Sequence, residues 1–205
     1  MKKTLYIILT LIALGLLYVR VRYSAPSGES LSSPTPTTTS ASPSTEPRVA
    51  LSKTLNNDYF SLSYPEVATT STSTAPDSQE WAITYMGEEQ VKSGRTQTEL
   101  WDGYAISITR FEATGDNPDR VQAEADRQGT IDACGVENVT EIKNGKVGSY
   151  AALTYFGGCL GEADQYYLMI ADTLYRVTVM VVGSDNYKTG YQTTTSAILE
   201  TLRFK

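Results

Sequence analysis

The sequence predicts an α+β domain in which helices pack on a mostly antiparallel central sheet of six to eight strands. Three observations lead to this fold class. Runs of alternating apolar and polar residues recur after the first fifty residues, turn-forming pairs separate several of these runs, and apolar residues at helical spacing close the chain. About 150 residues follow the first fifty, which is enough for one domain with its own core.

Residues 1–23 have the pattern of a membrane anchor. Two lysines precede the apolar run 5–19, and two arginines follow it. The run is somewhat short for a helix that spans a bilayer, but the flanking arginines can reach toward the lipid head groups and extend it. A cleaved signal peptide is the alternative, although Tyr23 and Pro26 make a poor cleavage site. We expect a single-pass anchor in the cell membrane, with the rest of the chain on the extracytoplasmic side.

Residues 24–54 are predicted to form a disordered stalk. Thirteen of the 24 residues in 24–47 are Ser or Thr and five are Pro, so this segment has almost no apolar surface to bury. Such composition is typical of spacers in exported proteins. We expect the stalk to hold the domain away from the membrane.

The domain, residues 55–205, begins with strand patterns. Residues 59–64 alternate and stop at Pro65, as a first strand should. Residues 69–78 are rich in Ser and Thr and predict a mobile loop, and 81–86 form the next strand.

Three two-residue turn signals predict hairpins. They are Asp102-Gly103 between strands 96–101 and 104–111, Asn144-Gly145 between strands 139–143 and 146–156, and Asp172-Thr173 between strands 166–171 and 174–182. The strand 174–182 carries apolar residues on both faces, which favours a central strand that is covered on both sides.

Two helices are predicted. The first is capped by Asn117, runs to about Gln128 and ends at Gly129, and its thin apolar face places it on the surface. That face consists of Val121 and Ala125. The second helix follows Ser184-Asp185 and has its apolar residues at helical spacing, namely Tyr187, Tyr191, Ile198 and Leu202.

Three stretches of the domain resemble the PsbP-like family, which is named after an extrinsic photosystem II subunit and includes a nuclear import factor and bacterial lipoproteins. The stretches are Phe60-Ser61-Leu62-Ser63-Tyr64-Pro65, Leu174-Tyr175-Arg176-Val177-Thr178 and Ile198-Leu199-Glu200-Thr201-Leu202-Arg203-Phe204. The resemblance covers about residues 55–204 and implies an α/β/α sandwich. Because known members act mainly as docking or assembly subunits, it also implies a binding role. No ligand-binding motif of the family matches residues here.

Composition excludes several chemistries. The chain has no histidine, which removes the commonest general base and transition-metal ligand, and with them the Ser-His-Asp and HExxH arrangements. After Ser24 there are 23 acidic and 13 basic residues, a net charge of −10 that disfavours nucleic acid as a partner. We expect no catalytic residues, no metal site and no cofactor.

Two groups of residues are the candidate site residues. Cys134 and Cys159 are the only cysteines, and in an oxidising compartment we expect them to form a disulfide; a pair of buried free thiols is the alternative. Fourteen tyrosines are present, and strand propensity explains most of them. The rest suggest an aromatic patch for a protein or glycan partner, built from Tyr155, Tyr166, Tyr167 and Tyr187.

The leading functional hypothesis is a membrane-tethered extracytoplasmic binding or assembly module without catalytic activity. A structural cell-envelope protein is the alternative. A carboxylate-based hydrolase such as a glycosidase comes third, and it would need a cleft with two facing acids about 5–10 Å apart.

Overall fold

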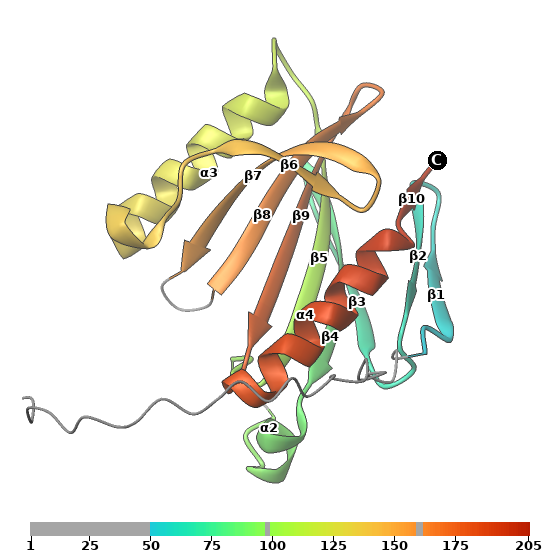
Figure 1. Ribbon diagram of the computed structural model, residues 1–205. Coiled ribbons are helices and arrows are strands. Elements are labelled where there is room, and N and C mark those ends of the chain that lie inside the picture. Colours follow the sequence, from blue (N-terminus) through green and yellow to red (C-terminus); the bar gives the residue numbers. More distant parts are fainter. Residues whose placement is uncertain (1–49, 97–98, 159–161) are drawn as a thin grey trace, which may run out of the picture. The chain divides into compact units, whose positions relative to one another are not determined.

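The computed structural model describes residues 50–96, 99–158 and 162–205 (Figure 1). The predicted anchor, residues 1–23, lies outside these ranges, as does most of the predicted stalk. None of the helices within these ranges is long and apolar enough to cross a membrane. The described elements are, in chain order, β1 (Lys53–Asn56), β2 (Phe60–Tyr64), β3 (Thr69–Ala75), β4 (Ser78–Met86), α2 (Glu88–Lys92), β5 (Gly103–Glu112), α3 (Pro118–Cys134), the 3₁₀ turn η1 (Val136–Asn138), β6 (Lys143–Val147), β7 (Tyr150–Gly158), β8 (Glu162–Ile170), β9 (Thr173–Val182), α4 (Asp185–Glu200) and β10 (Arg203–Phe204).

The larger sheet has seven strands in the order β3-β4-β5-β9-β8-β7-β6, and each neighbouring pair is antiparallel. β9 is therefore the central strand, as its two apolar faces predict. Its side chains alternate: Val177 and Val179 belong to the main core, whereas Arg176 and Thr178 point to the opposite face. The α+β fold class, with helices on a mostly antiparallel sheet, is confirmed.

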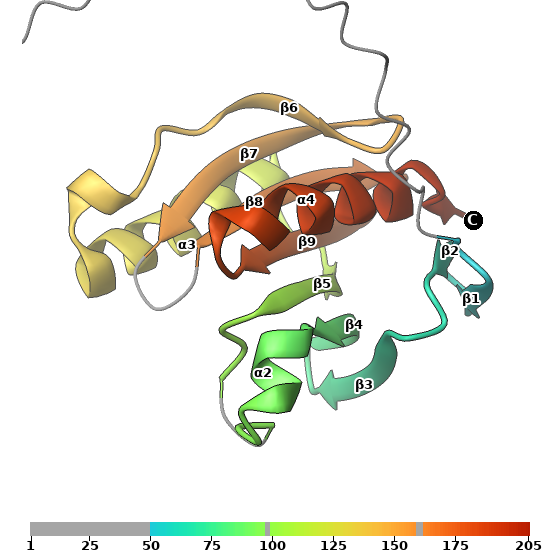
Figure 2. The same cartoon turned by 60° about the horizontal axis from the view of Figure 1, so that its bottom comes forward.

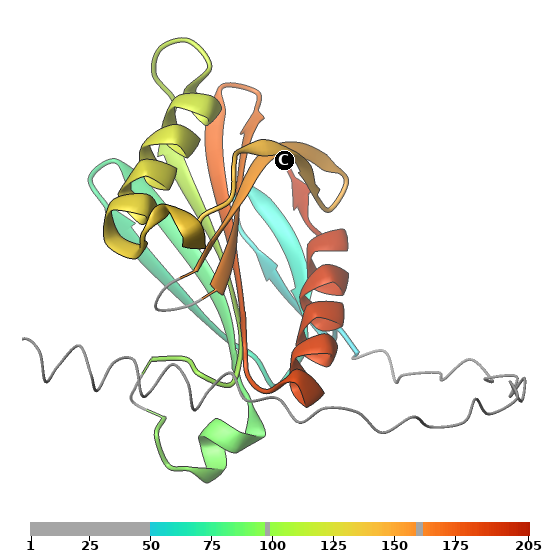
Figure 3. The same cartoon turned by 60° about the vertical axis from the view of Figure 1, so that its left-hand side comes forward.

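The two long helices lie on opposite faces of this sheet (Figure 3). α4 contacts β5 and β9 and contributes Ile198 to the main core, which also contains Val177 and Ile106. α3 contacts β7, β8 and β9 on the other face, where a smaller core contains Ala123, Tyr155 and Tyr167. Sheet and helices thus form the α/β/α arrangement.

A second sheet of three strands, in the order β1-β2-β10, completes the main core. Phe60, Leu62 and Tyr64 of β2 are buried there, as the alternation in this segment predicts. β1 includes Lys53 and Thr54, so the first strand begins within the last residues of the predicted stalk.

The prediction of a mobile loop at 69–78 is wrong, because these residues form β3 and the start of β4. β3 pairs with β4 from Thr69 opposite Thr84 to Ala75 opposite Ser78. β3 lies at the edge of the sheet. All seven of its residues are exposed, so the strand buries no side chain. Without a buried face there is no apolar alternation to find, and the β-branched threonines were the remaining signal.

The predicted strand 96–101 and its Asp102-Gly103 turn are also wrong. The described residues between β4 and β5 contain no strand; instead α2 lies beyond the ends of β4 and β5 (Figure 2). The Asp102 carboxylate accepts hydrogen bonds from the backbone N–H groups of Glu89 and Gln90, at 3.0 and 3.4 Å, so it caps α2 rather than making a hairpin turn.

The Gln90 side chain holds the segment between β4 and β5 in place through hydrogen bonds. Its side chain is completely buried, and its Oε1 accepts hydrogen bonds from the backbone N–H groups of Trp101 and Asp102. Its Nε2 donates to the carbonyl oxygens of Arg95 and Glu99. One buried amide therefore connects α2 with the segment that leads into β5.

The second hairpin forms with a different turn. Val147 pairs with Tyr150, so the turn consists of Gly148 and Ser149, and Asn144-Gly145 lies inside β6. Gly148 has φ +55°, and a Cβ there would lie 2.4 Å from the Leu199 carbonyl oxygen. Only glycine fits at such a position.

The third hairpin is confirmed with a shift of one residue. Ile170 pairs with Thr173, so its turn is Ala171-Asp172 instead of Asp172-Thr173.

The first predicted helix is longer than expected. α3 continues past Gly129 to Cys134 and ends at Gly135, which has φ +86° and donates its N–H to the Ile131 carbonyl oxygen. The predicted apolar face is wrong, since Val121 is 61% exposed while Ala123 is fully buried. In the second helix Ile198 is buried as predicted, and Leu202, which follows the end of the helix, is buried as well. Tyr187 of the predicted apolar face is instead 41% exposed.

Candidate functional site

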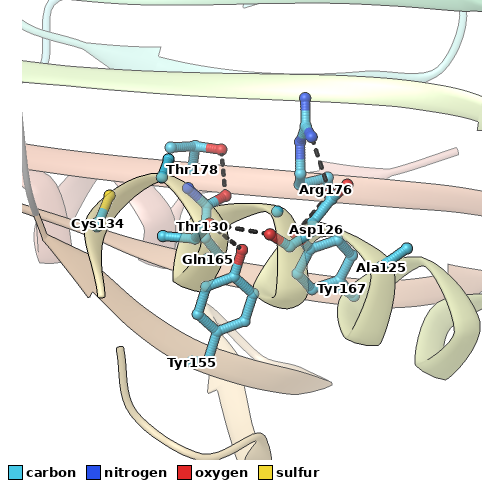
Figure 4. Close-up of a pocket in the computed structure, with 11 residues that line it drawn as sticks. Ala125, Asp126, Thr130, Cys134, Tyr155, Gln165, Tyr167, Arg176 and Thr178 are labelled. Atoms are coloured by element: carbon cyan, nitrogen blue, oxygen red, sulfur yellow. Dashed lines mark hydrogen bonds and ion pairs between the residues drawn. The ribbon is translucent and has the colours of Figure 1, made fainter. Parts of the chain in front are cut away.

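A cleft of about 530 Å³ lies between α3 and the face of the sheet that α3 covers (Figure 4). Its walls come from one side of α3 and from alternate residues of three adjacent strands. The lining residues are Ala125, Asp126, Gly129, Thr130, Ala133, Cys134, Tyr155, Gln165, Tyr167, Arg176 and Thr178. The cleft therefore depends on α3 packing over β7, β8 and β9.

A charged network lies along one side of this cleft. Asp126 Oδ2 accepts a hydrogen bond from the Tyr167 hydroxyl at 2.7 Å and forms an ion pair with Arg176 Nη1 at 2.9 Å (Figure 4). About a quarter of each charged side chain is exposed, 23% for Asp126 and 28% for Arg176. The two charges compensate each other, so the network brings no net charge to the cleft.

Neutral polar groups line the other side. The Thr178 hydroxyl donates to Gln165 Oε1 at 2.7 Å, and the Tyr155 and Thr130 hydroxyls lie 3.4 Å apart. The Thr130 hydroxyl also donates to the Asp126 carbonyl oxygen at 2.9 Å, a bond within α3. Hydroxyl and amide groups both donate and accept hydrogen bonds, so this side suits a ligand that does the same.

Arg176 has hydrogen-bonding capacity left over. Its Nε is buried and has no hydrogen-bond partner among the described residues. The guanidinium carbon lies 5.3 Å from the centre of the Phe111 ring, which holds the plane of the group in place. A buried N–H without an acceptor is destabilising by about 1–3 kcal/mol.

Small residues form the α3 wall of the cleft. Ala125, Gly129 and Ala133 follow each other at intervals of four on one side of the helix. A Cβ at Gly129 would meet open space, so packing does not require glycine there. Glycine inside a helix costs about 1 kcal/mol relative to alanine. At these three positions the wall presents no side chain larger than a methyl group to the cleft.

Tyr167 acts as a hydrogen-bonding group and not as a base. Burial, followed by the hydrogen bond to Asp126, raises the pKa of Tyr167 far above its usual value. Tyr167 consequently stays protonated at neutral pH and donates to Asp126.

The predicted tyrosines are divided between different surfaces. The rings of Tyr155 and Tyr167 stack 6.1 Å apart, but both are buried beneath α3. Tyr166 packs against the main core on the opposite face of the sheet. Tyr187 lies on α4 and is 41% exposed. The four residues do not share one surface.

Sequence reasoning missed the polar residues that line the cleft, above all Asp126 and Arg176. Arg176 is the single charged residue in the central strand β9, and that exception was the available signal. Asp126 had no comparable signal, since α3 is rich in charged residues throughout.

Cys134 lies at the end of α3 and lines the cleft. The described residues contain no free cysteine, but Cys159 lies outside them, so the disulfide stays a prediction. No group of His, Cys, Asp and Glu among the described residues could hold a metal ion.

Comparisons with known proteins concern the fold. No family model matches the chain, and no curated protein matches it. Among solved structures, it is similar to the solution structure of cyanobacterial PsbP from Synechocystis sp. PCC 6803, with a TM-score of 0.42, 8% identity, and coverage of 71% of this chain and 86% of that one. A crystal structure of a protein from Bacteroides thetaiotaomicron VPI-5482 matches with a TM-score of 0.33, 10% identity, and coverage of 71% and 45%. These two likenesses concern the fold and carry no information on ligand or partner.

Proposed function

We propose that this protein is a membrane-tethered extracytoplasmic binding module, without catalytic activity, that holds a polar uncharged ligand in the cleft beneath α3. The observation that carries the proposal is the cleft itself, in which neutral hydroxyl and amide groups on Thr130, Gln165 and Thr178 lie beside a charge pair that is already compensated.

The chemistry of the cleft favours a ligand rich in hydroxyl groups, such as a saccharide. Asp126 and Arg176 neutralise each other, so an ion would find no unpaired opposite charge. The remaining groups, on Thr130, Gln165 and Thr178, match hydroxyls that both donate and accept. The low wall of Ala and Gly gives space for the apolar face of a sugar ring.

The same geometry disfavours the other two hypotheses. Asp126 supplies the single carboxylate among the lining residues, whereas glycosidases use two acids that face each other. A structural envelope protein would have no use for a polar cleft.

Membrane tethering is proposed from the sequence. Residues 1–23 combine flanking basic residues with an apolar run, and the Ser/Thr/Pro-rich stalk separates them from the domain. Intact-mass measurement of the mature protein tests the anchor, since a species that begins at or after Ser24 would contradict it.

Binding is tested by obstructing the cleft. Gly129→Trp should fill it, and Gly190→Trp is the matched control, because Gly190 is also an exposed helical glycine whose Cβ would meet open space. Chemical-shift changes are recorded with glucose, N-acetylglucosamine and cellobiose, and with glutamate as a charged comparison.

We expect saccharides to shift signals of cleft residues in the unaltered chain and in the Gly190→Trp variant, and not in Gly129→Trp. Equal binding by both variants would contradict the cleft as the site. Preference for glutamate would contradict an uncharged ligand.

A further inference from the structure

The two edge strands of the seven-stranded sheet differ in the charge of their exposed side chains. β6, at one edge, exposes Lys143, Asn144 and Lys146. Lysines on an edge strand prevent pairing with other chains. β3, at the other edge (Figure 2), consists of Thr, Ser and Ala alone, and all seven residues are exposed. It has no charge, no proline and no covering element among the described residues.

The outer backbone groups of β3 follow from its pairing with β4. Ala75 and Ser78 flank a two-residue turn, so they form a hydrogen-bonded pair, and such pairs alternate along antiparallel strands. Thr70, Thr72 and Thr74 therefore direct their N–H and C=O groups away from β4. These three residues present a regular row of donors and acceptors that no other strand of the described part of the chain pairs with.

We infer that β3 pairs with β3 of a second copy of this chain, antiparallel about a two-fold axis at Thr72. This pairing sets Thr70 against Thr74 and Ser71 against Ser73, so every contact joins neutral residues, and Thr–Thr pairs are favourable across strands. The symmetry uses one edge of each copy, and the lysines on β6 disfavour further addition, so the assembly closes as a dimer.

The shape of β3 selects a second copy over a foreign peptide. Peptides that add to a sheet edge gain specificity from pockets for their side chains, and the fully exposed β3 has none to provide. The acidic domain repels itself elsewhere, so an uncharged strip is where two copies can meet. Seven residues per copy form a small interface, below about 1,200 Å², which predicts a weak dimer.

Cysteine cross-linking of the full chain in detergent micelles tests the contact. In the inferred register Thr72 of one copy lies opposite Thr72 of the other, and the two residues form a hydrogen-bonded pair. Their Cα atoms are then about 5.5 Å apart, which is within the range that a disulfide spans. Thr72→Cys should therefore form covalent dimers on mild oxidation. Ser71→Cys and the exposed α4 variant Thr193→Cys serve as controls, and the unaltered chain sets the background.

We expect Thr72→Cys to cross-link at least about tenfold faster than either control. Adding Thr70→Pro to Thr72→Cys should reduce that rate by about tenfold, because it removes an outward N–H that β4 does not use. Circular dichroism verifies that this variant stays folded. Raising NaCl from 20 to 500 mM should increase the rate, since salt screens repulsion between acidic domains. Equal rates at positions 71, 72 and 193, insensitivity to proline, or a decrease with salt would each overturn the inference.

Discussion

Replacing Tyr167 by phenylalanine removes one hydroxyl from the cleft and leaves the ring in place. That hydroxyl donates to Asp126 at 2.7 Å, and the side chain is fully buried. Hydrogen bonds to charged acceptors contribute about 1.5–3 kcal/mol to stability. Because Asp126 keeps Arg176 and is partly exposed, water can replace the lost donor. We therefore expect Tyr167→Phe to lower the free energy of unfolding by about 1.5 kcal/mol.

Asp126→Ala should cost more. It leaves the buried Tyr167 hydroxyl without its acceptor and Arg176 without its counter-charge, for an expected loss of about 3 kcal/mol. In the double variant the loss should again be about 3 kcal/mol, because the shared hydrogen bond can be lost only once. The difference from additivity, about 1.5 kcal/mol, measures the coupling.

Urea unfolding at pH 7, followed by intrinsic fluorescence, gives these energies if the dependence on urea is unchanged between variants. Tyr187→Phe on the exposed side of α4 is the control and should leave the free energy of unfolding unchanged. If the losses of the two single variants add up to the loss of the double variant within about 0.5 kcal/mol, the coupling is refuted, and with it the network that lines the cleft.

Three further predictions concern the whole domain. Stability should fall above about pH 10, because burial raises the pKa of Tyr104 and Tyr167 and the ionised form is then confined to the unfolded chain. Above that pH each such tyrosine lowers the free energy of unfolding by about 1.4 kcal/mol per pH unit. A urea midpoint that stays the same between pH 9 and 11 would contradict the predicted fall in stability. Gln90→Leu should lower the free energy of unfolding by about 3 kcal/mol, with faster exchange of the hydrogen-bonded amides between β4 and β5, and retained protection would count against it. Thiol titration of the unfolded, unreduced chain should find no free thiol, because Cys134 and Cys159 are predicted to form a disulfide. A bridge that closes a loop of 26 residues would stabilise the fold by about 3–4 kcal/mol. Two free thiols per chain would disprove the bridge.

Local pattern was sufficient where a strand or helix buries one face. The alternation in 59–64, the two apolar faces of 174–182 and the helical spacing before Leu202 each predicted an element that the structure contains. Burial imposes its own period on the sequence, so such elements can be identified without knowledge of their neighbours.

Turns and edges were predicted less well, for a physical reason in each case. β3 buries nothing, so its Ser and Thr residues have the composition of a loop. Asn144-Gly145 suits a tight turn, but the chain turns at Gly148, where the Leu199 carbonyl oxygen leaves no space for a side chain. Gly129 could end a helix, yet packing of Ala123 and Ile131 against the smaller core carries α3 on to Cys134.

The sequence by itself determined the fold class, the central position of β9 and the burial of the segments that alternate. Only the tertiary structure decided the cleft, since Asp126 and Arg176 are fifty residues apart and meet because α3 lies across β8 and β9. It also separated the tyrosines, because neighbours in a strand point to opposite faces: Tyr167 lies beneath α3, and Tyr166 lies in the main core. Hydrophobic periodicity and composition are local properties of a few consecutive residues, whereas this cleft is formed by contacts between residues far apart in the sequence.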